Sequence, residues 1–172
     1  MYLKKLVGFT LIEVLVVLSI MGIMLGFLVV RYGQDERQNL QLESHRLALL
    51  MSHASNTART TGQPIAWQAS DSGYQFLQYS PLLNQWQKIS STNTQVDAAL
   101  RERQLPEDLR IIKLNIAGTE SNLKKQEYEM IIFSPNGLNP AFELTIQSPH
   151  AIVEVKGDML GTVEDLPAIN LQ

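Results

Sequence analysis

The chain has no cysteine and only three histidines among its 172 residues. Without thiols it can form no disulfide, no thiolate nucleophile and no cysteine-ligated metal site. It also lacks an excess of positive charge, since 14 basic and 17 acidic side chains give a formal net charge of −3 at pH 7. This balance offers no electrostatic reason to bind nucleic acid or anionic lipid. The first proline is Pro64, so no proline kinks a helix before that point.

The N-terminal region instead contains one long apolar run. Residues 9–30 include fifteen Leu, Ile, Val or Phe side chains and a single acid, Glu13. A helix of this length spans about 33 Å, enough to cross the hydrocarbon core of a bilayer. One charge at mid-membrane costs roughly 2.5–3.5 kcal/mol, but the apolar side chains, at about −0.3 to −0.6 kcal/mol each, outweigh it. We therefore predict that 9–30 is a transmembrane helix and that Glu13 has a function.

The residues before the run set its orientation. Lys4 and Lys5 favour a cytoplasmic N-terminus by the positive-inside rule, so the remainder of the chain is exported. A secretory signal peptide has its small-residue cleavage site after the apolar region, whereas Gly8 precedes it here. Cleavage at Gly8 would remove two lysines, leaving 12 basic and 17 acidic side chains and a net charge of −5. It would also retain the apolar run as the new N-terminus.

The sequence KKLVGFTLIE, residues 4–13, resembles the class III signal of type IV pilins and of type II secretion pseudopilins. The resemblance implies cleavage by a prepilin peptidase between Gly8 and Phe9, followed by N-methylation of the Phe9 amine. It also assigns Glu13 to subunit assembly. The alternative is an ordinary single-span anchor with one acid near its edge.

The chemistry of these residues is consistent with that assignment. A buried charge without a partner is strongly disfavoured, so the Glu13 carboxylate could pair in lipid with the Phe9 ammonium of a neighbouring subunit. Gly22 and Gly26 form a small-xxx-small pair, a pattern that lets membrane helices approach closely. We treat this pair as a candidate helix-packing site.

Residues 31–61 are predicted to continue the same helix into the exported domain. A single apolar stripe at helical period is formed by Leu40, Leu47, Met51, Ala54 and Ala58. Gly62 followed by Pro64 is a typical helix stop. The predicted organisation is a cleaved leader over 1–8, the transmembrane half of the helix over 9–30, its periplasmic half over 31–62, and an antiparallel β domain over 63–172.

Beyond Pro64 the apolar period changes to two, which is typical of strands. The pattern predicts strands at 65–68, 74–79, 109–116, 128–133, 141–146, 151–155 and 160–163. Residues 81–106 are predicted to be a long loop with a helical turn near 96–103, and 118–125 a second loop. The Asn136–Gly137 pair favours a tight turn with positive φ. Short antiparallel strands after one amphipathic helix imply an α+β fold.

The C-terminal part is similar to the signature of the H-type minor pseudopilins of type II secretion. The resemblance is carried by IFSPNG at 132–137, by PAFEL at 140–144 and by a final hairpin of the type Gly-x-x-Gly-x-Val at 157–163. It implies a pilin-like fold, in which a long N-terminal helix packs on two antiparallel β-sheets. The absence of a C-terminal disulfide counts against a major pilin, since many type IV pilins carry one.

The same resemblance implies a structural subunit and no enzyme. Its place would be near the tip of the periplasmic pseudopilus that drives export of folded proteins across the outer membrane. The implied partners are other major and minor pseudopilins, the prepilin peptidase and the inner-membrane secretion platform, with exoprotein substrates as further candidates. The implied location is the bacterial inner membrane, single-pass, with a cytoplasmic N-terminus and a periplasmic C-terminal domain.

The alternative function is that of a minor type IV pilin, acting in pilus assembly or DNA uptake. Capture of DNA needs lysines or arginines clustered where phosphates arrive. Residues 126–172 contain one such residue, Lys156, among a clear excess of acids. We therefore expect no nucleic-acid partner.

No catalytic or metal-binding pattern accompanies these features. The sequence has no phosphate-binding loop, His-Glu-x-x-His helix or nucleophile elbow. The acids Asp158, Glu164 and Asp165 lack the regular spacing of a calcium loop. We expect no catalytic residue, no metal and no cofactor, and we interpret the histidines as structural or surface residues at His45, His53 and His150. Core packing and cross-strand pairing are predicted for Trp67, Tyr74 and Phe76.

Overall fold

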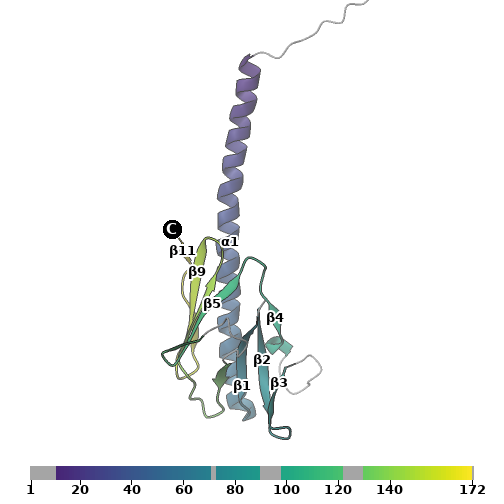
Figure 1. Cartoon of the computed structure of the whole chain (residues 1–172), viewed down its shortest axis with the longest axis vertical. Helices are drawn as coiled ribbons and strands as arrows, with labels where there is room; N and C mark the ends of the chain where they lie inside the picture. Colours follow the sequence, from purple (N-terminus) through teal and green to yellow (C-terminus); the bar gives the residue numbers. More distant parts are fainter. Residues whose placement is uncertain (1–10, 71–72, 90–97, 122–129, 172) are drawn as a thin grey trace, which may run out of the picture. The chain divides into compact units, whose positions relative to one another are not determined.

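The computed structural model describes residues 11–70, 73–89, 98–121 and 130–171, and the side chains of these except 26–35, 98 and 121. The chain divides into two compact units, Met1–Glu36 and Arg37–Gln172. Helix α1 (Leu11–Thr61) contributes to both units, and every described strand belongs to the second (Figure 1).

The first unit, as far as it is described, consists of the N-terminal part of α1. Its side chains from 11 to 25 are all exposed, and Glu13 lies in the first turn of the helix. Within the described residues, no helix is both long and apolar enough to pass through a membrane. The predicted transmembrane segment, 9–30, includes residues outside that described set.

In the second unit, α1 buries the stripe that its sequence predicts. The five stripe residues have no exposed surface, namely Leu40, Leu47, Met51, Ala54 and Ala58. The helix ends at Thr61, and Gly62 takes a φ of 68°. A left-handed residue just after a helix is the conformation that glycine adopts without steric cost. The predicted helix and its stop are therefore confirmed.

Two antiparallel sheets cover this part of the helix, as the resemblance implies. The first has the order β3 (Gln85–Lys88), β2 (Gly73–Ser80), β1 (Ile65–Ser70) and β7 (Met130–Phe133), with β4 (Arg103–Gln104) also paired to β2. The second has the order β10 (Val163–Asp165), β9 (Ala151–Gly157), β8 (Phe142–Gln147), β5 (Arg110–Ile116) and β6 (Thr119–Ser121), with β11 (Ile169–Asn170) also paired to β9.

The predicted loops are wrong in part. Strands β3 and β4 lie within 81–106, β6 lies within 118–125, and β11 was not predicted at all. The helical turn expected in the first loop is present as a 3₁₀ helix at Ala98–Leu100. These missed strands are short and polar, as is common at sheet edges, where an apolar alternation would invite aggregation. The last predicted strand, 160–163, is shifted, because β10 begins only at Val163.

The core lies between α1 and the two sheets. Trp67, Tyr74 and Phe76 are fully buried, with ring centroids 6.2 Å apart for Trp67–Tyr74 and 6.1 Å apart for Tyr74–Phe76. This confirms their prediction as core residues, and burial raises the pKa of Tyr74 to about 12. The sheets meet through Phe133 of β7 and Phe142 of β8, whose rings lie edge to face at 6.5 Å.

Candidate functional site

The predicted N-terminal site is described only in part. Gly8 and Phe9 lie outside the described residues. Glu13 is exposed in the first turn of α1. A side chain added at Gly22 would meet nothing within 4 Å, and Gly26 belongs to the same helix. The helix thus presents an apolar surface that includes Leu11, 84% exposed, and exposed apolar surface of this extent is typical of membrane or protein interfaces.

The C-terminal signature forms a second site, at the Thr61 end of α1. The amide of Gly137 donates to the carbonyl of Ser134 over 3.0 Å, and Gly137 has a φ of 81°. This confirms the predicted tight turn with positive φ. The turn joins no hairpin, because β7 and β8 belong to different sheets. It carries the chain from one sheet to the other beside Arg59, whose Nε lies 3.4 Å from the position of a Cβ at Gly137.

Asn139 fixes this turn to two other elements. Its Oδ1 accepts from the amide of Ser134 at 2.9 Å, and its Nδ2 donates to Oγ of Ser55 on α1 at 3.3 Å. Its own amide donates to the carbonyl of Met159 at 2.9 Å. Asn139 is 6% exposed, and buried polar groups need such partners. Sequence reasoning missed it, because an asparagine in a loop carries no signal of burial.

The final hairpin contains two glycines whose positions leave no room for a side chain. At Gly157 a Cβ would lie 2.0 Å from Cε1 of Phe142, and at Gly161 it would lie 2.1 Å from Oγ of Ser55. Gly161 also has a φ of 89°. Three residues separate the two glycines, one more than in the pattern quoted above. The signature thus marks the positions where the hairpin contacts the helix and the neighbouring strand.

Asp158 holds the tip of this hairpin. Its Oδ1 accepts from the amides of Leu160 at 2.9 Å and Thr162 at 2.8 Å. The bond from the Thr162 backbone, with further help from the Leu160 amide, keeps the pKa of the Asp158 carboxyl below its usual value, because both bonds favour the ionised form.

The C-terminal segment is fastened to α1 by polar contacts. Arg37 donates to the carbonyl of Ala168 at 2.8 Å. Gln41 donates to Oδ2 of Asp165 at 2.7 Å and accepts from the amide of Ala168 at 2.8 Å. Nδ1 of His45 lies 2.9 Å from Oδ1 of Asp165. These helix residues are four apart, so they share one face. The sequence predicted His45 only as a structural or surface residue and gave no indication of its pairing with Asp165.

The acids near the C-terminus do not converge. Asp158 bonds to its own hairpin and Asp165 bonds to α1. Among the residues that the structure describes, no three His, Asp or Glu side chains gather where a metal ion could bind.

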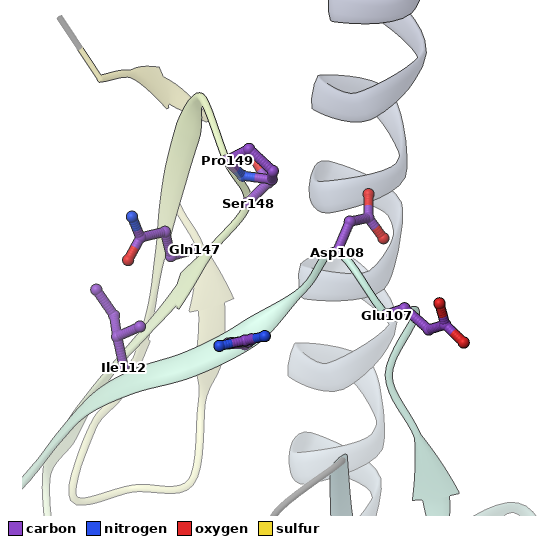
Figure 2. Close-up of a pocket in the computed structure, with 7 residues that line it drawn as sticks. Glu107, Asp108, Ile112, Gln147, Ser148 and Pro149 are labelled. Atoms are coloured by element: carbon purple, nitrogen blue, oxygen red, sulfur yellow. The ribbon is translucent and has the colours of Figure 1, made fainter.

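Several hollows lie on the surface of the second unit, among them the following two. The first, about 290 Å³, is shown in Figure 2. It is lined by the segment before β5 (Glu107 and Asp108), by Arg110 and Ile112 of β5, and by the turn after β8 (Gln147, Ser148 and Pro149). The second, about 490 Å³, follows the exposed face of α1 and includes Leu42 and Leu49.

Comparison with known proteins gives matches over both sites. The model of the family "Type II transport protein GspH" matches residues 43–161, and that of the "Prokaryotic N-terminal methylation motif" matches residues 8–29. A curated relative, "Type II secretion system protein H" from Aeromonas hydrophila, is 26% identical over 171 residues, covering 90% of each chain.

Solved structures with the same fold include two of the minor pseudopilin EpsH from the type II secretion system of Vibrio cholerae. One has a TM-score of 0.56 at 18% identity and covers 75% of this chain and 97% of its own. The other has a TM-score of 0.59 at 16% identity and covers 76% and 98%. These matches confirm the pilin-like α+β fold.

Proposed function

The chain belongs to the type II transport protein GspH family, and on this premise we propose that it acts as a minor pseudopilin, a structural subunit near the tip of the periplasmic pseudopilus. The observation that carries the proposal is the family match over 43–161, which includes the buried helix stripe from Leu47 to Ala58, strands β1 to β9 and both glycines of the final hairpin. The alternative of a minor type IV pilin ranks lower, because the family, the curated relative and the similar structures are all type II secretion proteins.

The N-terminal motif supports a processed and membrane-anchored subunit. The methylation-motif match begins at Gly8, where we propose that a prepilin peptidase cleaves, with methylation of the Phe9 amine to follow. Lys4 and Lys5 would keep the N-terminus in the cytoplasm. The apolar half of α1 would then cross the inner membrane once and leave the second unit in the periplasm.

Assembly with other pseudopilins follows from the exposed apolar helix. In lipid the Glu13 carboxylate of one subunit would pair with the Phe9 ammonium of the next, because an unpaired charge there is strongly disfavoured. The open space at Gly22 would let a neighbouring helix approach closely. The secretion platform would build the filament, and exoproteins would contact its tip.

Replacement of Glu13 tests this function directly. We expect Glu13→Ala to be cleaved and inserted normally, to be lost from pseudopili, and to abolish exoprotein export in cells that lack the native copy. The matched control is Ser19→Ala, since the Ser19 hydroxyl donates to Leu15 of its own helix at 2.9 Å. Mass spectrometry of the membrane-bound protein reports its N-terminus. An intact Met1, or full export with Glu13→Ala, would contradict the proposal.

A further inference from the structure

We propose that residues 166–171, named here the C-terminal strap, open and close over α1 as one piece while the rest of the second unit stays folded. The closed strap holds α1 at the point where the helix enters that unit, and the open strap releases it. This conformational device is independent of the proposed function.

The helix holds the strap by its backbone. The carbonyl of Ala168 accepts from the guanidinium of Arg37 at 2.8 Å, and the carbonyl of Leu166 accepts from the side-chain amide of Gln41 at 3.3 Å. The backbone amide of Ala168 donates to Oε1 of Gln41 at 2.8 Å. The side chains of two helix residues therefore take the place that a neighbouring strand would have beside the strap.

The sheet holds the strap by its backbone as well. The amides of Leu166 and Leu171 donate to the carbonyls of Glu154 and His150, each at 2.8 Å. Between these two bonds, β11 pairs antiparallel with β9 (Figure 1). The strap thus bridges one helix and one strand, so a movement that lifts it from α1 also breaks its bonds to β9.

Little apolar burial opposes such a movement. Among the residues of the strap, all of which the structure describes, Ala168 alone is buried, at 5% exposure. The larger apolar side chains lie partly in solvent, with Leu166 38%, Leu171 40% and Ile169 62% exposed. Segments with few buried apolar contacts open locally at a fraction of the global free energy of unfolding. The strap can therefore open while the core between α1 and the two sheets stays intact.

The strap binds α1 at the boundary between the two compact units. The division falls between Glu36 and Arg37, so the residue bonded to Ala168 is the first of the second unit. The first fully enclosed helix side chain in that unit is Leu40, because residues 37–39 are exposed. The closed strap thus holds about one turn of helix that the core does not yet enclose.

Hydrogen exchange of the full chain in detergent tests this device. We expect the bonded strap amides to exchange through one common opening, faster than the amides of β8. Gln41→Ala removes the side chain that bonds to both Leu166 and Ala168. It should speed exchange of the strap amides, and of the α1 amides around Arg37, by about tenfold, the effect of one to two net hydrogen bonds. The amides of β8 should keep their rates.

A second variant and a matched control separate the strap from the core. Ala168→Asp places a charge at the one buried position of the strap, so it should open the strap and preserve the near-ultraviolet circular dichroism of the buried Trp67. Arg46→Ala is the control, because it removes only the exposed pair with Glu43 on the same helix, at 2.6 Å, and it should leave strap exchange unchanged.

Four outcomes would overturn the proposal. Strap amides that exchange only together with β8 would show that the strap has no opening of its own. Unchanged α1 amides around Arg37 in Gln41→Ala would show that the strap does not hold the helix. Loss of the Trp67 signal in Ala168→Asp would make the strap part of the core. An equal response to Arg46→Ala would assign the effect to the helix alone.

Discussion

Replacement of Asn139 by alanine should destabilise the second unit more than any exposed polar change in the same turn. The substitution removes the bonds to the Ser134 amide and to the fully enclosed Ser55 hydroxyl. A net hydrogen bond contributes about 0.5–1.5 kcal/mol, and a buried partner left unsatisfied costs about 1–3 kcal/mol. The expected loss is about 2–4 kcal/mol, which for a chain of this length lowers Tm by about 5–15 °C.

The assay is thermal unfolding of the full chain in detergent, followed by near-ultraviolet circular dichroism of the buried Trp67. The control is Asn136→Ala, which removes one bond, to the Leu138 amide, in an exposed turn. Its expected cost is about 0.5 kcal/mol. Equal shifts in Tm for the two variants would refute the argument that Asn139 joins the turn, the helix and the hairpin.

Two further predictions concern the final hairpin. Gly157→Ala should lower the free energy of unfolding by about 1–3 kcal/mol, because its Cβ would overlap the Phe142 ring. In the same unfolding assay, the double variant Gly157→Ala, Phe142→Leu should lose less stability than the sum of the two single variants. Strict additivity would contradict the overlap. The bonds from the Thr162 and Leu160 amides lower the pKa of the Asp158 carboxyl. The stability that this carboxylate adds to the folded state is therefore present above its unfolded pKa, about 3.9, and is lost as the pH falls through its folded pKa. The Tm difference between wild type and Asp158→Asn should therefore shrink on acidification below about pH 4, and a difference independent of pH would argue against this role.

The helix and the longer strands are predictable because their signals are local. The stripe from Leu40 to Ala58 repeats at helical period, and β8 and β9 alternate at period two. The edge strands β3 and β11 are not predictable in this way, because each is short and has no apolar alternation, although β3 pairs with the preceding strand β2 and β11 pairs with β9.

The candidate site at the C-terminal signature is likewise predictable only in part. Glycines 137, 157 and 161 are visible in the sequence as a signature, but the reasons for them are tertiary contacts with Arg59, Phe142 and Ser55. Asn139, Gln41 and the pair of His45 with Asp165 could not be predicted, since each acts across 84 to 124 residues of chain. The bulge at Ile112 could not be predicted either, because an extra residue in a strand leaves the composition of the strand unchanged.

The polar contacts between α1 and the C-terminal segment make the order of each depend on the other. Arg37 and Gln41 donate to the carbonyls of Ala168 and Leu166, and Gln41 also accepts from the amide of Ala168. A chain truncated after Asp165 would lack these bonds although β1 to β10 were still present. Loss of residues 166–171 should therefore loosen the part of α1 around Arg37 and Gln41 as well as β9, which would lose its pairing with β11.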